Sequence, residues 1–330
     1  MKRLTTRLPN STAKTRLDDY LFEWLPSALG KPVPKSKIRT LIVSGAVYVN
    51  RHRNKLASTD IFAGAVLEVY YDEAKLNLSG HPSSAPVTSL KNEQILFEDE
   101  WIILVNKSAG IPTQPTIDPG RANLFDLTKQ FLTRRNAGKT AGKFEVYLGL
   151  HHRLDRDTSG VVMFTKKEAA NKGVADLFSE HRIQKTYQCL VWRSPAAPLH
   201  QKQDRFEVKN FLGRISTKSE NARFGSVTSN GDPAHTYFRV LEVFRDAYWI
   251  EAQPKTGRTH QIRVHLSELN LPIFGDPQYF PQNVFPMISA PRLLLHAHLL
   301  QFDHPVTGLP LTVEAPLPDD FLGVLGKLRP

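Results

Sequence analysis

A Ser-, Pro- and Gly-rich segment constrains the architecture of this 330-residue chain more than any other feature. The segment, residues 77–92 (NLSGHPSSAPVTSLKN), has little hydrophobic periodicity, which is typical of a linker. It separates a head, residues 1–76, from a body, residues 93–330, so we expect two domains. The alternative is that the segment is a long surface loop within one domain.

Composition restricts the class of partner. The chain has 43 Lys and Arg against 32 Asp and Glu, a formal net charge of +11, which favours a polyanionic partner without separating RNA from DNA or an anionic membrane. The single cysteine, Cys189, excludes an intramolecular disulfide and a cysteine-based zinc site, as suits a reducing compartment. The first residues lack the apolar core of a secretory signal, and no apolar run reaches the length of a membrane span. We therefore expect a soluble, cytoplasmic protein.

Hydrophobic periodicity in the head predicts two helices followed by short strands. The first helix covers residues 16–25 (RLDDYLFEWL) and is limited by Pro26, and the second covers residues 36–44 and stops at Gly45. Strands follow at residues 46–50 (AVYVN) and 65–71 (AVLEVYY). The head is therefore expected to be a compact α+β module.

Positive charge is concentrated in the head, which carries 13 basic and seven acidic residues. Residues 31–55 contain no acidic residue and seven basic ones: Lys31, Lys35, Lys37, Arg39, Arg51, Arg53 and Lys55. A cluster of one sign beside a helix and a hairpin favours a surface that contacts phosphates, and an ordinary solvated face is the alternative.

The body alternates candidate strands with turns and a few helices. Strands are predicted at residues 94–97, 101–106, 160–165, 186–192, 236–243 and 248–252. Helices are predicted at residues 123–133, 167–181 and 259–266. Because few strands are spaced as regular strand-helix-strand units, we expect an α+β fold, with a mixed, mainly antiparallel sheet and peripheral helices.

Residues 151–160 (HHRLDRDTSG) are the most unusual stretch of the body. They gather two histidines, two arginines and two aspartates directly before the apolar run VVMFT. Polar groups on a turn that a strand holds in place suit a catalytic loop. A surface turn whose charges neutralise one another explains the same residues equally well.

A second polar stretch, residues 251–266 (EAQPKTGRTHQIRVHL), combines a tight turn at Thr256 and Gly257 with a helix that carries Arg263. Burial of an unpaired arginine costs several kcal/mol, so Arg263 needs an anionic partner, for which a carboxylate of residues 151–160 would serve. The alternative is an amphipathic helix whose arginine reaches solvent.

Residues 184–192 (QKTYQCLVW) alternate as a strand, with Lys185, Tyr187 and Cys189 on one face. Tyr187 is either an ordinary core aromatic or a platform on which a nucleic-acid base stacks.

Together these stretches resemble the successive motifs of a known enzyme family. HRLDRDTSG, KTYQCLV and TGRTHQIRVHL, followed by PIFGDPQY and RLLLHAHLLQFDHP, are similar in order and spacing to the RNA pseudouridine synthases of the ribosomal-large-subunit branch. The similarity covers residues 95–321. One departure is Ser108, which follows Asn106 and Lys107 where the family usually has proline. In the head, RLDDYL, SKIRTLIVSGAVYVN and AGAVLEV resemble the S-four-like RNA-binding domain, named for a ribosomal small-subunit protein.

The resemblance implies that the protein isomerises specific uridines of structured ribosomal or transfer RNA to pseudouridine, after the target base is flipped out of its stack. It implies a role for each of four residues: Asp155 as the catalytic carboxylate, Tyr187 in contact with the target base, Arg263 as the partner of Asp155, and Arg153 in the space that the flipped nucleotide leaves. Asp157 is then structural. The reaction needs neither a metal nor another cofactor, and we expect a monomer.

Two rival functions fit parts of the sequence. A catalytically silent RNA-binding or ribosome-assembly factor would keep the fold, but it has no physical need for Asp155, Tyr187 and Arg263 together. A metal-dependent nuclease is disfavoured because the sequence has no convincing cluster of metal ligands. No short motif identifies the uridine that is modified, because RNA shape determines that choice.

Overall fold

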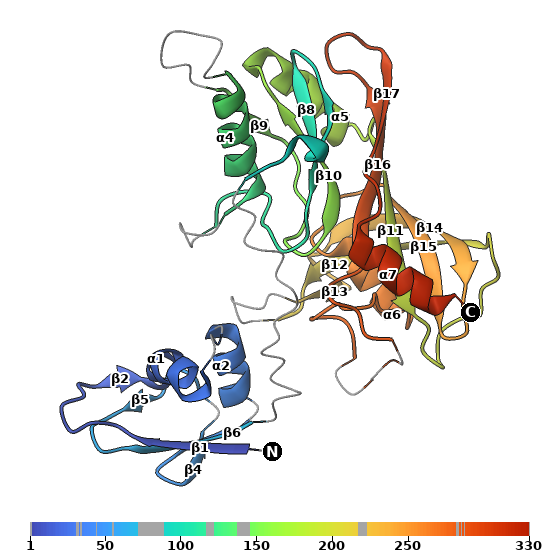
Figure 1. Cartoon of the computed structure of the whole chain (residues 1–330). Helices are drawn as coiled ribbons and strands as arrows, with labels where there is room; N and C mark the ends of the chain where they lie inside the picture. Colours follow the sequence, from blue (N-terminus) through green and yellow to red (C-terminus); the bar gives the residue numbers. More distant parts are fainter. Residues whose placement is uncertain are drawn as a thin grey trace. The chain divides into compact units, whose positions relative to one another are not determined.

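The computed structural model describes residues 2–30, 33, 35–43, 45–54, 56–71, 89–116, 122–136, 146–216, 223–281, 284, 286 and 288–329. The chain divides into two compact units, Met1–Pro82 and Ser83–Pro330, and each is described by itself (Figure 1). Most of the predicted linker, residues 77–88, lies outside the described residues. In the described part of the chain, no helix is long and apolar enough to cross a membrane.

The first unit packs two helices against a small antiparallel sheet. Its elements are β1 (Lys2–Arg7), β2 (Thr15–Arg16), α1 (Leu17–Leu29), α2 (Lys35–Val43), β3 (Val47–Val49), β4 (His52–Asn54), β5 (Asp60–Ile61) and β6 (Val66–Tyr71). The sheet order is β1-β6-β3-β4, and β2 pairs with β5. Leu21 of α1, Ile38 of α2 and Leu67 of β6 are fully buried in one core. The predicted sequence of two helices followed by short strands is therefore confirmed.

Two features of this unit differ from the prediction. Helix α1 continues through Pro26 to Leu29, although an interior proline removes a backbone donor and crowds the preceding turn, so the expected stop at Pro26 is wrong. The helix ends at Gly30, which has a φ of +67° and donates its N–H to the Pro26 carbonyl. Strand β1, which pairs with β6 over six residues, was not predicted.

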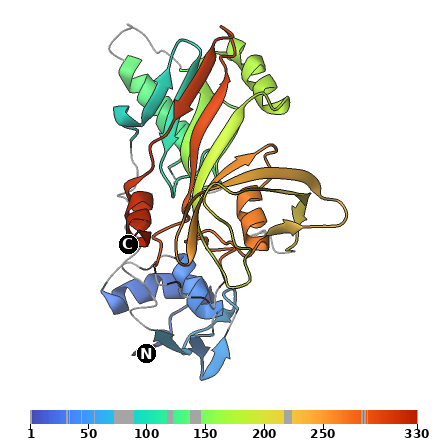
Figure 2. The same ribbon diagram turned by 90° about the vertical axis from the view of Figure 1, so that its right-hand side faces the viewer.

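The second unit is built on one sheet of eleven strands (Figure 2). The strands are β7 (Ile95–Glu98), β8 (Ile102–Lys107), β9 (Gly149–Leu150), β10 (Ser159–Thr165), β11 (Gln184–Trp192), β12 (Arg205–Arg214), β13 (Phe224–Ser226), β14 (Asp232–Val243), β15 (Ala247–Pro254), β16 (Leu295–Asp303) and β17 (Pro310–Glu314). Their order is β13-β12-β14-β15-β11-β16-β10-β8-β7, with β17 on β16 and β9 on β10. Among the described strands only β10 and β16 pair in parallel, so the predicted mixed, mainly antiparallel sheet is confirmed.

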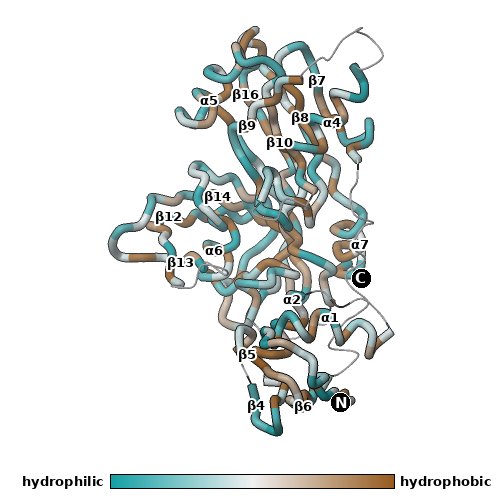
Figure 3. Tube along the Cα trace, turned by 90° about the vertical axis from the view of Figure 1, so that its left-hand side faces the viewer, coloured by the Kyte–Doolittle hydropathy of each residue, from teal (hydrophilic) through white to brown (hydrophobic). Residues whose placement is uncertain are grey.

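Helices cover both faces of this sheet. They are α4 (Leu124–Asn136), α5 (Asn171–Ser179), α6 (Gln261–Glu268) and α7 (Asp319–Leu328), with short 3-10 turns at Asn92–Gln94 and Glu168–Ala170. Leu132 of α4 packs with Val162 of β10, whereas Val174 of α5 packs with Val161, so α4 and α5 lie on opposite faces of that strand. All seven residues of β10 are buried, and Figure 3 shows the apolar character of β8 and β10.

All six predicted strands of the body are present, and two helices need correction. The predicted helix at residues 167–181 is a 3-10 turn followed by the shorter α5. The predicted helix at 259–266 begins only at Gln261, because His260 before it has a φ of +57°. Ser108, the departure from the family pattern, lies in the turn after β8, where its hydroxyl is 3.4 Å from Gln94 Nε2.

Candidate active site

The two histidines of residues 151–158 fix this loop to strand β10. His152 Nε2 accepts a hydrogen bond from the Met163 N–H at 2.8 Å, and its ring stacks on Phe178 with 4.5 Å between centroids. Burial lowers the pKa of His152 to about 3, so the ring is neutral and can accept this bond. His151 Nε2 lies 3.2 Å from Thr165 Oγ1. Both histidines therefore serve the structure of the loop.

Lys107, the last residue of β8, holds the same loop from the interior. Its side chain is fully buried, and its ammonium donates to the carbonyl oxygens of Ser108, Ile111 and Arg156 at 3.0, 2.8 and 2.8 Å. These acceptors satisfy all three donors of the ammonium group. Burial lowers the pKa of Lys107 to about 7. The lysine thus fixes the backbone one residue after Asp155.

The parallel pair of β10 and β16 is short, with Ser159 opposite His296 and Gly160 opposite Ala297. Ser159 Oγ lies 2.9 Å from His296 Nδ1, and His296 Nε2 lies 3.1 Å from the Ala315 carbonyl oxygen. Because a carbonyl only accepts, Nε2 carries the proton and Nδ1 accepts from the Ser159 hydroxyl. Gly160 has a φ of +117°, and a Cβ there would lie 2.1 Å from the Ala297 oxygen, so no other residue fits.

Arg263, on α6, is held by a buried carboxylate that the sequence analysis did not single out. Its Nε and Nη2 donate to Asp276 Oδ2 and Oδ1 at 2.7 and 2.8 Å, and the two side chains are 6% and 0% exposed. Asp276 Oδ1 also accepts from the N–H groups of Gln278 and Tyr279 at 2.9 and 3.1 Å. Burial opposes the charge of Arg263, but its interactions with Asp276 and Asp155 raise its pKa. The guanidinium is therefore a fixed cation.

Asp155 contacts the remaining side of this guanidinium. Arg263 Nη1 donates to Asp155 Oδ2 at 3.2 Å, and the Asp155 side chain stays 34% exposed. Asp155 Oδ1 makes no hydrogen bond to any residue that the structure describes. The expected contact between Arg263 and a carboxylate of residues 151–160 is thus present, and it leaves one carboxylate oxygen available to a ligand.

His260 is a further group beside Asp155, and the sequence analysis missed it. Its Nε2 lies 3.7 Å from Asp155 Oδ2, and its Nδ1 lies 3.0 Å from the Tyr279 hydroxyl, which accepts the Phe224 N–H at 3.0 Å. In the tautomer whose Nδ1 accepts the Tyr279 hydroxyl proton, the ring N–H lies on Nε2, the nitrogen nearer to Asp155. Burial and the charge of Arg263 lower the pKa of His260, which keeps the ring neutral.

Asp155 and Arg263 line a pocket, the catalytic pocket, with a cavity volume of about 110 Å³. Tyr187 and Arg153 line it too, so the structure brings together the four residues that the family resemblance singled out. Thr186, the neighbour of Tyr187, lines a different cavity, as the predicted alternation requires. Burial, with the charge of Asp155, raises the pKa of Tyr187, so its hydroxyl stays protonated.

Asp157, the second carboxylate of the loop, has different surroundings. It is not among the described residues that line the catalytic pocket. Both of its oxygens accept hydrogen bonds from the guanidinium of Arg156, at 2.8 Å each. The two aspartates of the loop are therefore distinguished by their neighbours.

The basic residues predicted for the head make contacts within that unit. The structure does not describe the side chains of three of them: Lys31, Lys37 and Lys55. The other four are Lys35, Arg39, Arg51 and Arg53. Arg39 Nε donates at 3.1 Å to Asp18, whose side chain is fully buried, and Lys35 is paired with Asp19. Arg53 donates to the Gly45 carbonyl at 2.7 Å, whereas Arg51 is exposed. Part of the predicted cluster thus stabilises the head.

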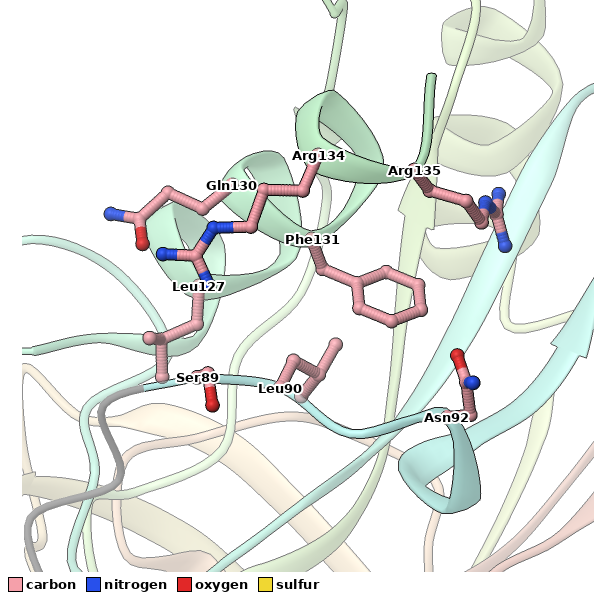
Figure 4. Close-up of a pocket in the computed structure, with 8 residues that line it drawn as sticks. All are labelled: Ser89, Leu90, Asn92, Leu127, Gln130, Phe131, Arg134 and Arg135. Atoms are coloured by element: carbon pink, nitrogen blue, oxygen red, sulfur yellow. The ribbon is translucent and has the colours of Figure 1, made fainter. Parts of the chain in front are cut away.

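Another cavity of the body, of about 300 Å³, lies where residues 89–92 pass α4 (Figure 4). Phe131 of α4 points toward Leu90, and Arg135 lies to one side, where it forms a bidentate ion pair with Glu98. None of the residues predicted for the active site lines this cavity.

Comparison with known protein families identifies the class of protein that has this site. The family model of the RNA pseudouridylate synthases matches residues 101–268, a span that holds the Asp155 loop, Tyr187 and Arg263. Fold and site thus define an isomerase that acts on RNA. The chain belongs to the RNA pseudouridylate synthase family.

Curated relatives cover nearly the whole chain. The ribosomal large subunit pseudouridine synthase C of Pasteurella multocida (strain Pm70) is 33% identical, over 96% of this chain and 91% of its own length. The synthase of the same name from Escherichia coli O157:H7 is 32% identical, over 96% and 94%. The ribosomal large subunit pseudouridine synthase D of Zymomonas mobilis is 29% identical, over 94% and 95%. The similarity therefore includes the head as well as the body.

Solved structures agree with the fold. Human RNA pseudouridylate synthase domain containing 4 is similar with a TM-score of 0.55 and 26% identity, over 72% of this chain and 93% of that chain. Human RNA pseudouridylate synthase domain containing 1 has a TM-score of 0.51 and 24% identity, over 72% and 94%, and this likeness concerns the fold alone.

Proposed function

We propose that this enzyme isomerises uridines of large-subunit ribosomal RNA to pseudouridine, with Asp155 as the catalytic carboxylate. The RNA class follows the names of relatives that are about one third identical over nearly the whole chain. The position of Asp155 carries the proposal for its role. Arg263 holds Oδ2 at 3.2 Å, while Oδ1 has no hydrogen-bond partner among the described residues, in an open pocket.

A carboxylate suits this reaction because the bond between base and sugar must break before carbon five of the base bonds to the sugar. A carboxylate can stabilise positive charge that develops on the sugar, or trap the sugar covalently, as in retaining glycosidases. Arg263 orients Asp155, and its bidentate pair with Asp276 keeps that orientation fixed.

The target uridine must leave its stack to reach Asp155, at a cost of a few kcal/mol. Tyr187 lines the catalytic pocket, so its ring can pack on the extruded base and offset part of this cost. Because its hydroxyl stays protonated, Tyr187 can also donate a hydrogen bond. Arg153 lines the same pocket, and its planar guanidinium suits the position that the base has left.

We assign the head, residues 1–76, as an S-four-like RNA-binding domain that a linker, residues 77–92, joins to the catalytic body, residues 93–330. Two helices followed by the β3–β4 hairpin, which carries the cations Arg51 and Arg53, support this assignment. Removal of residues 1–76 should weaken RNA binding and reduce its salt dependence by roughly 0.7 to 0.9 in log-log slope for each phosphate that the head neutralises. Turnover at saturating RNA should persist.

Release of tritium from RNA that carries uridine tritiated at carbon five tests the function, because the new carbon–carbon bond displaces that hydrogen. The wild-type enzyme should release tritium from large-subunit ribosomal RNA, and Asp155→Asn should not. Mapping of pseudouridines in the product then identifies the uridine. If the wild-type protein binds ribosomal and transfer RNA but releases no tritium from either, a catalytically silent RNA-binding factor becomes the better assignment.

A further inference from the structure

A second cavity, of about 330 Å³, opens next to the catalytic pocket. Its walls are residues 181–185, between α5 and the start of β11, residues 253–255, at the end of β15, and Gln301 of β16. Lys185 and Pro254 line both cavities, so the two share a wall. We call this second cavity the basic pocket.

The charges around the basic pocket have one sign. Arg182, Lys185 and Lys255 line it, and no acidic residue is among the described residues of its walls. Three cations around one cavity repel a cation and favour an anion. The pocket therefore selects its ligand by charge.

Lys185 differs from the other two cations in its burial. Its side chain is half-buried, yet its ammonium makes no hydrogen bond or ion pair to any residue that the structure describes, and burial lowers its pKa. The Lys107 ammonium, by contrast, is fully buried and has its donors satisfied by three carbonyl oxygens. Lys185 thus keeps its hydrogen-bonding capacity for a group from outside the chain.

The other two cations are held weakly and can turn toward a ligand. Arg182 Nε donates to Glu180 at 2.7 Å, but both side chains are more than half exposed. Lys255 is exposed and lies over the Tyr237 ring at 5.6 Å from its centre. Exposed contacts of these kinds contribute little to stability, so an anion can replace them.

We propose that the basic pocket binds a backbone phosphate of the RNA strand next to the target uridine, with Lys185 as the central contact and Arg182 and Lys255 beside it. This inference rests on the proposed function, because the uridine at Asp155 determines which phosphates lie nearby. A strand whose base enters the catalytic pocket must continue past its rim, and the rim that Lys185 and Pro254 form leads into the basic pocket. The bound phosphate then fixes the position of the strand relative to Asp155.

Phosphate ethylation tests this site, since ethylation removes the charge of one phosphate at a time. A transcript of large-subunit ribosomal RNA is ethylated sparsely, bound RNA is separated from free RNA, and the phosphates whose ethylation prevents binding are mapped. The variants are Lys185→Gln and Lys255→Gln, and Lys327→Gln, at an exposed position of α7, is the charge-matched control. Lys185→Arg keeps the charge and should keep the contact in part.

With the wild-type protein, ethylation of a phosphate adjacent to the modified uridine should prevent binding. In Lys185→Gln that interference should disappear while interference elsewhere persists, and the salt slope of binding should fall by about 0.7. Lys255→Gln should weaken the same interference, and because Lys255 is exposed this variant tests the site even if Lys185→Gln does not fold. Lys327→Gln should give the wild-type pattern.

An interference pattern that is the same in wild type, Lys185→Gln and Lys255→Gln would overturn the phosphate site. Tritium release from the same RNA is measured separately. A folded wild-type protein that releases no tritium would overturn the proposed function. The interference pattern alone tests whether the basic pocket binds a phosphate.

Discussion

The floor and the rim of the catalytic pocket use their polar groups differently. Arg263 and Asp276, which we call the floor, are almost fully buried, and the Asp276 carboxylate accepts four hydrogen bonds from described residues. At Asp155 and Lys185, which we call the rim, the Asp155 side chain is one third exposed and its carboxylate accepts a single hydrogen bond from a described residue, and the Lys185 ammonium makes none. The comparison indicates that buried groups whose hydrogen bonds are all made within the protein fix the geometry of the pocket. Groups with unused hydrogen-bonding capacity are then the ones expected to contact the RNA.

Removal of the rim carboxylate should affect turnover most and stability least. Asp155→Asn deletes a charge with little change in volume, so we expect tritium release to fall by about three orders of magnitude or more. The free energy of unfolding, measured in urea, should change by less than about 0.5 kcal/mol. Asp157→Asn is the matched control, because Asp157 is outside the described lining of the pocket, and it should remain active. If Asp155→Asn is active and Asp157→Asn is inactive, then Asp157 and not Asp155 is the catalytic carboxylate.

Removal of the floor carboxylate should have the opposite balance. Asp276→Asn leaves Arg263 buried without its full partner, so the free energy of unfolding should fall by about 3–5 kcal/mol, and activity should fall with it. Asp320→Asn is the control, because Asp320 also forms a bidentate pair, with Arg292, but is 40% exposed. It should cost about 1 kcal/mol or less. Equal losses in the two variants would contradict the distinction between floor and rim.

His260 joins floor and rim, and we expect it to position Asp155. His260→Asn should tolerate the positive φ and remove the ring N–H that is directed toward Asp155. We expect kcat to fall about tenfold, equivalent to about 1.4 kcal/mol, with KM unchanged. If KM rises instead and kcat is unchanged, His260 contacts the RNA and does not position Asp155.

The smallest expected effect concerns pH and Lys107. Its pKa is lowered to about 7 in the folded chain, below its ordinary value of 10.5, so the unfolded chain binds more protons above pH 7. The wild-type protein should therefore gain stability relative to Lys107→Met as pH rises from about 7, by about 1 kcal/mol between pH 7 and 8. Relative to Lys327→Met, in which the substituted lysine is exposed, the wild-type protein should show no such gain in stability. Parallel stability curves for wild type and Lys107→Met would refute this prediction.

Local patterns in the sequence predicted the rim better than the floor. The alternation of residues 184–192 placed Tyr187 and Lys185 on one face, and both line the catalytic pocket. For Arg263, charge pairing left an exposed arginine open, and the family resemblance singled out the contact with Asp155 that the structure shows. The alternation succeeded because it depends on one short segment, whereas the contact needed the resemblance.

Asp276 and the Ser159–His296 contact were missed because these residues follow no periodic pattern or lie far apart in the chain. Asp276 occupies a turn, where its hydrogen bonds to the Gln278 and Tyr279 N–H groups leave no hydrophobic signal. His296 is 137 residues from Ser159, and the polar residues within β16 mask its strand pattern. Strand β12 was missed for a related reason, since most of its residues are exposed or half-buried.

The parallel pair of β10 and β16 also has a consequence for the order of synthesis. It joins the strand that follows the Asp155 loop to a strand made 137 residues later, and β16 lies between β10 and the strand that carries Tyr187. At about 5–20 residues per second, translation needs on the order of ten seconds to make that intervening chain. The two halves of the catalytic pocket cannot meet before β16 has emerged. A nascent copy of this enzyme is therefore unable to modify RNA until most of its own sequence has left the ribosome.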